Sequence, residues 1–321
     1  MILLEATQFH EVIPFPTQRS PLRQIAFMSA YAPETVSPSA EGHAMALYGA
    51  GDIDEALDVA QEALTEARQN EGHSLQLVNA LETLADIQRN EGEFEKAESL
   101  YLEALEAAQK IGVPLERLAL LRSDLAALYD FSQREEQAIP LYEQAIADYD
   151  TERPKHDRLS AQLRNNLAMI YKSLGRYALA EQHYLVALDM MEKVFTRAND
   201  RVAAIFNNLG SLYYTAGFPQ QAKEMHQDAL KIRTEVLGPN DPEVAQSYCN
   251  LATACYTLED MAGMQENYDK SLSIMEMKIE VTQDSYRSAA DDYAAALESI
   301  GEMRKATAVR RRAEKVLRRL S

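Results

Sequence analysis

Hydrophobic side chains recur along this chain with the period of an α-helix, in two successive segments joined by a short turn. Leu159, Leu163, Leu167 and Ile170 follow the i, i+3, i+4 spacing that places apolar residues on one helix face. Gly175 then marks the turn, because glycine ends a helix at little cost in a left-handed backbone conformation. The pattern predicts a pair of amphipathic helices.

This pair is repeated at a fixed spacing. The stretches RNNLAMIYKSLG, FNNLGSLYYTAG and YCNLATACYTLE begin at residues 164, 206 and 248, so 42 residues separate each from the next. A small residue recurs in every first helix, at Ala44, Ala85, Ala126, Ala168, Gly210, Ala252 and Ala294. The turn position holds Gly51, Gly92, Gln133, Gly175, Gly217, Glu259 and Gly301. These columns predict seven helix pairs.

The second helices carry three further columns. One is occupied by small residues except in the sixth copy, at Ala56, Ala97, Ala138, Ala180, Ala222, Met264 and Ala306. The next is mostly aromatic, at Ala60, Tyr101, Tyr142, Tyr184, His226, Tyr268 and Arg310. The last is small again, at Ala63, Ala104, Ala145, Ala187, Ala229, Ser271 and Ala313. Small residues let helices approach closely, and because one pair cannot bury its apolar face alone, the pairs must stack.

We therefore expect an all-α array beginning at residue 39. The repeats lie near residues 39–72, 74–112, 115–153, 157–198, 199–240, 241–282 and 283–321. Local irregularity is expected in the third copy, which has Gln133 at the turn, and in the sixth, which has Met264 in the alanine column. Residues 1–38 form an N-terminal arm that contains five prolines. This arm is either poorly ordered or docks on its own array, and both interpretations stay open.

The motif F-x2-L-G-x2-Y from Phe206 to Tyr213, followed by Ala222 and Ala229, resembles the tetratricopeptide repeat. The usual repeat has about 34 residues. The 42-residue form, with its linker IRTEVLGPNDPEVA at 232–245, is similar to the kinesin-light-chain-like subfamily. The resemblance implies a right-handed superhelical solenoid whose first helices line a concave groove.

A row of asparagines in the first helices needs a separate explanation, because asparagine is a poor helix former. Asn166, Asn208 and Asn250 stand one residue before the leucine of each copy, and Asn165 and Asn207 precede the first two. By resemblance this row lines the groove, where an amide can bond both the C=O and the N–H of an extended peptide. Alternatively, the asparagines bridge neighbouring helices. The resemblance implies a peptide-binding site.

Other side chains on the same helices should face that groove, at three and six residues beyond the asparagines. They are Lys172, Ser211, Tyr214, Thr253 and Tyr256. Acidic residues flank the groove, with Glu82, Asp86, Asp124 and Asp130 towards one end and Asp291, Asp292 and Glu298 towards the other. They favour a neutral to basic extended partner segment, although they are also compatible with a solvated face.

Charge narrows the choice of partners further. The net charge of −18 argues against nucleic acid as a partner. Residues 304–321 are the exception, with eight Lys or Arg and one acid. This helix is a solvated cap, or it binds an acidic partner such as a second copy of the chain. In the second case, weak and salt-sensitive self-association is expected. Nucleic acid or an anionic membrane is the least favoured partner for it.

No catalytic motif is present, and the six histidines show no metal-ligand spacing, so the sequence predicts neither an enzyme nor a cofactor or metal site. Cys249 and Cys255 are interpreted as reduced structural thiols. The first residues do not resemble a signal peptide, and no stretch is apolar enough to span a membrane, which predicts a cytoplasmic protein. The predicted function is a peptide-binding interaction scaffold. The alternative is a regulator whose superhelix changes when a peptide binds.

Overall fold

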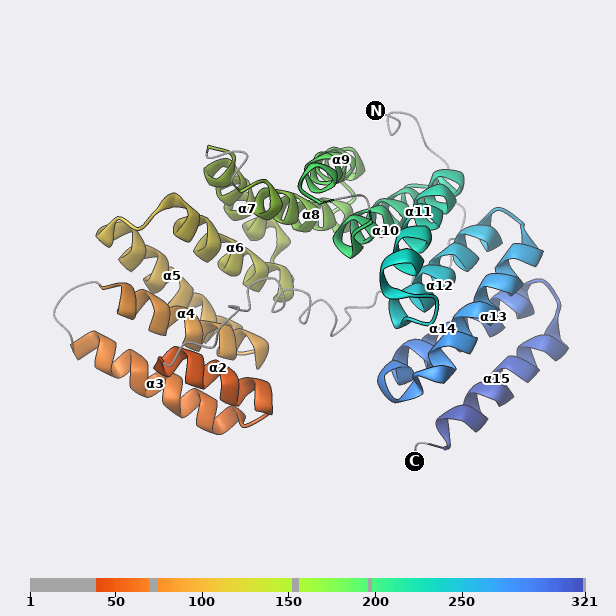
Figure 1. Ribbon diagram of the computed structural model, residues 1–321, viewed down its shortest axis with the longest axis horizontal. Coiled ribbons are helices and arrows are strands. Elements are labelled where there is room, and N and C mark those ends of the chain that lie inside the picture. The colour runs from red at the N-terminus through yellow and green to blue at the C-terminus, as the bar shows by residue number, and fades with distance from the viewer. Residues whose placement is uncertain (1–38, 70–73, 152–155, 196–197, 320–321) are drawn as a thin grey trace. The chain divides into compact units, whose positions relative to one another are not determined.

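The structure, a computed structural model, describes residues 39–69, 74–151, 156–195 and 198–319. Within these residues the chain forms fourteen α-helices and no strand (Figure 1). The predicted all-α fold is confirmed. The predicted N-terminal arm, residues 1–38, lies outside the described part of the chain.

The helices follow one another as pairs. Their bounds are α2 (Ala40–Ala50) with α3 (Ile53–Gln69), α4 (Leu75–Asn90) with α5 (Phe94–Ile111), α6 (Leu115–Phe131) with α7 (Glu135–Asp150), α8 (Asp157–Ser173) with α9 (Tyr177–Val194), α10 (Asp200–Thr215) with α11 (Pro219–Leu237), α12 (Pro242–Thr257) with α13 (Met261–Met277), and α14 (Ile279–Ser299) with α15 (Met303–Leu317). Partners such as α10 and α11 pack together, and α12 also contacts the first helices on either side, α10 and α14. Successive stacked pairs make the chain an all-α solenoid.

The described residues divide into two compact units within α8. The N-terminal unit runs from α2 to Leu163, and the C-terminal unit from Arg164 to α15. Each unit has its own core of stacked helix pairs, as expected when a repeat contacts mainly its neighbours. All of the predicted site residues belong to the C-terminal unit.

The small columns are the places where helices meet. Every alanine of the first-helix column is completely buried, and so is the second-helix column, including Met264. Four residues further on, Tyr101, Tyr142 and Tyr184 are at most 1% exposed. In the last copy the equivalent Arg310 is exposed, since no described helix packs over it. A polar residue there suits the outer surface of a terminal repeat.

All seven turn residues adopt a left-handed conformation, with φ between 59° and 90°. At a typical turn, the N–H of Gly175 donates to the carbonyl of Lys172 and that of Arg176 to the carbonyl of Tyr171. Gln133 (φ 63°) and Glu259 (φ 59°) keep the same turn although they carry side chains. The irregularity expected at the Gln133 turn is therefore absent, because the hydrogen bonds and packing of the helix pair impose the conformation. The irregularity expected in the sixth copy is absent at Met264 too, which is completely buried like the alanines of its column.

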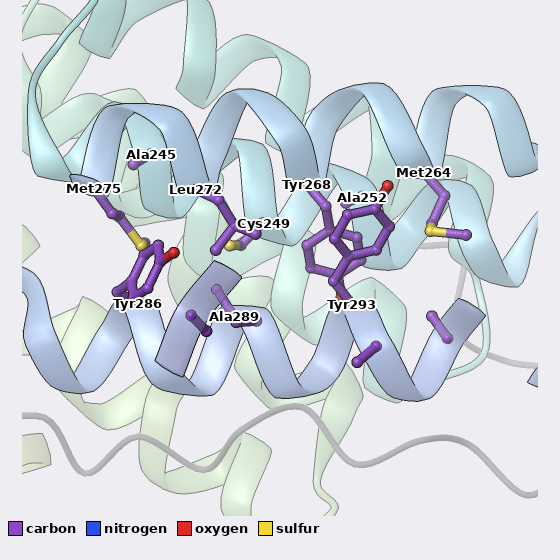
Figure 2. Packing of buried hydrophobic residues seen from close by; sticks show 14 of the residues in the cluster. Ala245, Cys249, Ala252, Met264, Tyr268, Leu272, Met275, Tyr286, Ala289 and Tyr293 are labelled. Atoms are coloured by element: carbon purple, nitrogen blue, oxygen red, sulfur yellow. The ribbon is translucent and has the colours of Figure 1, made fainter. Parts of the chain in front are cut away.

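The core of the C-terminal unit is aromatic between α13 and α14. The rings of Tyr268 and Tyr293 stack with centroids 4.9 Å apart, and Met275 lies beside Tyr286 (Figure 2). Tyr268 and Tyr293 are 4% and 3% exposed. Such a pair contributes roughly 0.5–1.5 kcal/mol beyond the area that it buries. Tyr268 of the aromatic column thus fills space between α13 and the next helix pair.

The long linker after α11 is held by one buried side chain. Arg233 in α11 is 6% exposed, and its guanidinium donates to the Ser247 hydroxyl at 3.0 Å and pairs with the Glu243 carboxylate at 2.8 Å. Asp241 caps α12 by accepting from the N–H of Glu243, and Pro242 begins that helix. These contacts fix where α12 starts relative to α11.

Candidate functional site

The asparagine row lies on α8, α10 and α12, which are successive first helices of the C-terminal unit. We call the five residues Asn165, Asn166, Asn207, Asn208 and Asn250 the asparagine face. Four of them are half-buried, and Asn250 is 7% exposed. Helical geometry places the leucines of these helices in the core, so the residue before each leucine is turned out of it.

The amides of the asparagine face bond one another from helix to helix. Nδ2 of Asn208 donates to Oδ1 of Asn165 at 2.9 Å, and Nδ2 of Asn250 donates to Oδ1 of Asn207 at 2.6 Å. Both pairs are separated by 43 residues, one repeat and one position. The bridge between neighbouring helices, which the sequence left open as an alternative, is therefore present.

These bridges leave part of the hydrogen-bonding capacity of the amides unused. An asparagine side chain offers two N–H donors and one oxygen acceptor. Within the described residues, Nδ2 of Asn207 and Oδ1 of Asn208 make no hydrogen bond. Asn207 thus keeps free donors while its oxygen serves the bridge, and Asn208 keeps a free acceptor. Together they present both polarities to a ligand.

Lys172 and Ser211 are held close to each other between α8 and α10. Nζ of Lys172 donates to Oγ of Ser211 at 2.8 Å, so the lysine is tied across two helices. Both side chains are half-buried. This contact brings together two residues that the sequence assigned to the same site. It also uses part of the donor capacity that Lys172 would offer to a ligand.

The two predicted tyrosines differ in exposure. Tyr214 is 5% exposed and its hydroxyl accepts from Thr257 at 3.3 Å, so it has little surface to offer a ligand. Burial raises its pKa above the usual value. Tyr256 is half-buried and its hydroxyl lies 2.7 Å from the Ser299 hydroxyl. These two hydroxyl contacts also link residues 43 positions apart, like the amide bridges.

Thr253 faces the core more than the sequence suggests. Its hydroxyl donates to the carbonyl of Cys249 at 3.1 Å and lies 3.3 Å from the hydroxyl of Tyr268. Sequence reasoning also missed Gln246, whose Nε2 donates to Oδ1 of Asn250 at 3.1 Å. Gln246 precedes Asn250 by four residues in α12, and side chains at this spacing meet on a helix. This spacing is the signal that could have predicted the contact.

A buried histidine lies directly behind this part of α10. The ring of His226 in α11 is fully buried, and a Cβ added to Gly210 would lie 2.6–2.8 Å from three of its atoms. Only glycine leaves room for the ring at this close approach. Burial, and then the positive charges of Arg233 and Lys172, lower the pKa of His226 to about 3. The imidazole is therefore neutral at physiological pH.

The acidic residues in the N-terminal unit are largely compensated. Glu82 in α4 accepts two hydrogen bonds from Arg117 in α6, and Asp86 pairs with the buried Arg89 at 3.2 Å. Burial raises the pKa of Asp124 well above its usual value, and the charges of Asp86 and Glu82 raise it further. This cluster therefore presents less negative charge than its composition suggests.

In the C-terminal unit, Asp292 occupies the position in α14 that is equivalent to Asn250 in α12. It is half-buried and makes no hydrogen bond or ion pair within the described residues. Burial and the neighbouring charge of Asp291 raise its pKa. Glu298, by contrast, is paired with Arg310, with Nη2 3.0 Å from Oε2.

Within the described residues, no group of three or more His, Cys, Asp or Glu side chains is arranged to hold a metal ion. Both cysteines are free and buried, and burial raises the pKa of Cys249 to about 12. Their thiols are thus protonated and packed in the core. None of the described helices is long and apolar enough to cross a membrane.

The sequence model of one family, described as Tetratricopeptide repeat, matches residues 36–110, 76–151, 116–193 and 201–263. The chain belongs to the tetratricopeptide repeat family. The match covers the asparagine face and all helices from α2 to α12. As a tetratricopeptide array, the chain is a protein-interaction scaffold. Among curated protein sequences, none matches it.

Three solved structures are similar to this chain. BtubC (BKLC) from P. vanneervenii is 33% identical, with a TM-score of 0.64 over 70% of this chain and 92% of that one. A putative kinesin light chain with nearly identical repeats, from Podosopora anserina, is 20% identical, with a TM-score of 0.56 over 63% and 96%. The apo quorum sensor NprR from B. thuringiensis is 14% identical, with a TM-score of 0.56 over 92% and 93%. The predicted likeness to kinesin-light-chain-like repeats is confirmed in the fold.

Proposed function

We propose that this tetratricopeptide array binds an extended peptide segment along the asparagine face. The observation that carries the proposal is the unused capacity at neighbouring positions, a free amide donor on Asn207 and a free amide oxygen on Asn208. A peptide backbone offers a C=O and an N–H at alternate points, which these two groups match without reading side chains. The bridges hold both amides in place before a ligand arrives, which reduces the entropy cost of binding.

The partner segment is neutral to basic in this proposal. Asp292 continues the row in α14 and has no partner within the described residues. A Lys or Arg of the bound segment would neutralise this half-buried carboxylate and lower its raised pKa. Asp292→Asn should therefore weaken binding of segments that carry a basic residue, and should leave neutral segments unaffected.

Asn207→Asp is the variant that separates binding from structure. It keeps the oxygen that accepts from Asn250 and removes the two free N–H donors. Neutral peptides selected from a random library on the wild-type chain serve as probes, because the carboxylate that the variant adds would attract a basic residue, and affinities are measured by fluorescence polarisation. Binding should weaken about 5- to 10-fold, which corresponds to one lost hydrogen bond of about 1 kcal/mol or slightly more. The urea midpoint should stay unchanged.

Two further variants complete the test. Asn208→Ala removes the bridge to Asn165 as well as the free oxygen, so both affinity and stability should fall. Gln227→Ala removes an exposed amide from α11 and should change neither. If Asn207→Asp binds the selected peptides as tightly as the wild type, the asparagine face has only a bridging role and the proposal is wrong.

A peptide-responsive regulator is the second candidate. The observation that favours it is the division of the chain into two compact units within α8, the helix that carries Asn165 and Asn166. The fold is also similar to that of the apo quorum sensor NprR over most of the chain. Small-angle X-ray scattering with and without a selected peptide tests this candidate. An unchanged radius of gyration on saturation would leave the simple scaffold.

A further inference from the structure

The last helix, α15, divides its cations between two roles. One face is buried through Ala306 and Ala313, and the flanks of that face carry arginines that pair with other helices. Arg310 bonds Glu298, and Arg312 bonds Glu276 with Nε 2.7 Å from Oε1. These ion pairs fasten α15 to the array. They account for only part of its positive charge.

The remaining cations form an exposed stripe. Arg304, Arg311, Lys315 and Arg319 are exposed and make no hydrogen bond or ion pair within the described residues. Arg304, Arg311 and Lys315, spaced by 7 and 4 residues, lie on one side of α15, and Arg319 follows two residues after the helix ends at Leu317. That side is opposite the one that holds Ala306 and Ala313. We call these four residues the basic stripe.

The second helix of the first pair, α3, carries an exposed row of acidic residues. Asp54, Asp58, Glu62 and Glu66 follow one another at intervals of four residues, and all are exposed. None of them has a hydrogen-bond or ion-pair partner within the described residues. The only cation of α3, Arg68, is already paired with Glu103 at 2.6 Å. We call these four acids the acidic stripe.

We propose that the basic stripe of one copy docks on the acidic stripe of a second copy, so that the chain associates head to tail. The two stripes lie on the second helices of the last and first pairs, labelled α15 and α3 in Figure 1. Each has four charges, of opposite sign, spread over 16 residues in the basic stripe and 13 residues in the acidic stripe. Contact between two different surfaces is heterologous, so the assembly closes as a ring or extends as a filament.

The charge of the rest of the chain favours another copy over a nucleic acid. The chain carries −18, and residues 304–321 contribute eight bases and one acid, so the other residues carry −25. A polyanion that approached the basic stripe would be repelled by this body. A second copy carries the same net charge, so its docking rests on the local match between the two stripes. Two acids of α5 are less available to a partner, because Glu98 is paired with Arg134 and Glu103 with Arg68.

Association through exposed charges is weak and depends on salt. Each exposed pair contributes little because both side chains are well hydrated. The screening length falls from about 30 Å at 0.01 M salt to about 3 Å at 1 M. Sedimentation velocity should therefore show mass above the monomer at low salt, rising with protein concentration, and a monomer at high salt.

A charge swap identifies the two surfaces. Arg311→Glu/Lys315→Glu puts two acids at the centre of the basic stripe, and Asp58→Arg/Glu62→Arg puts two bases at the centre of the acidic stripe. Each variant alone should weaken association about 10- to 30-fold, because two attractive contacts become repulsive. A mixture of the two variants should associate as the wild type does. The two new acids of one variant then meet the two new bases of the other.

The control changes the same charge elsewhere. Lys231→Glu/Arg287→Glu has the same net charge as Arg311→Glu/Lys315→Glu. Its two positions are exposed and have no partner within the described residues. It should associate like the wild type. Circular dichroism confirms that every variant stays helical. A wild-type monomer at low salt at every concentration, a failed rescue by the mixture, or an equal loss in the control would each overturn the proposal.

Discussion

Acidification should destabilise the C-terminal unit through the imidazole of His226. This side chain is fully buried, and its pKa in the folded chain is lowered from 6.5 to about 3, mainly by burial. The folded state keeps the ring neutral where the unfolded chain binds a proton. A base whose pKa is lower in the folded state stabilises the fold above its unfolded pKa, and this stabilisation is lost as the pH falls from about 6.5 towards 3.

The size of the effect follows from these two pKa values. Between about pH 7.5 and about pH 5.5 the unfolded imidazole becomes protonated, and linkage gives a loss of about 1.4 kcal/mol in the free energy of unfolding. Both pH values lie above the sequence pI of 4.8, where a net charge near zero favours precipitation. Arg233 and Lys172 are the charges that add to the effect of burial.

The assay is urea unfolding at the two pH values, followed by far-ultraviolet circular dichroism because the chain has no Trp. Amide hydrogen exchange in α10 and α11 locates the loss, since parts of a repeat array can open separately. His226→Phe removes the titrating group, so its loss should be about 1.4 kcal/mol smaller than that of the wild type. His43→Gln, at an exposed position in α2, should keep the wild-type difference. Equal losses in the wild type and His226→Phe would refute the reasoning.

Two further predictions concern the backbone and the linker. Glu259→Gly should stabilise the chain by about 0.5–1 kcal/mol in urea unfolding, because a side chain is strained at its φ of 59°. Gly175→Ala places a side chain at φ 71° and should destabilise the chain by about 1 kcal/mol. Equal effects of the two changes would contradict this. Arg233→Met should lower the free energy of unfolding by about 2 kcal/mol, because it leaves Ser247 and Glu243 without their buried donor. Lys231→Met, an exposed change two residues earlier, should stay within about 0.5 kcal/mol, and a similar loss there would refute the role of Arg233.

The repeat and its helix pairs could be predicted from the sequence because their signals are local. The spacing of Leu159, Leu163 and Leu167 fixes a helical face within three turns, and a glycine at the turn marks where the helix ends. Alanines that recur at one spacing show where helices meet, since only small side chains allow close approach. Each such column is buried as predicted. At Gln133 and Glu259 the repeat predicted where the turn lies but not its left-handed conformation, because neighbouring hydrogen bonds override the preference of one residue.

The asparagine face shows where sequence reasoning stops. The sequence places Asn165 and Asn208 in neighbouring repeats, one position out of step, but whether their amides meet depends on the distance between α8 and α10. The structure decides that they bond each other, and it leaves Asn207 with free donors. The close approach of Gly210 to His226 is likewise a property of packed helices. A single sequence contains no such distance.

For the charged residues, too, the sequence determined one part of the picture and the tertiary structure another. The sequence by itself determined that the body is acidic and that residues 304–321 are basic, because this requires only counting. Only the tertiary structure decided which charges are already paired: Glu82 is held by Arg117, and Arg312 by Glu276, whereas Arg311 and Lys315 stay exposed. The physical reason is that Coulomb attraction depends on the separation of two groups and on their exposure to water, and folding sets both.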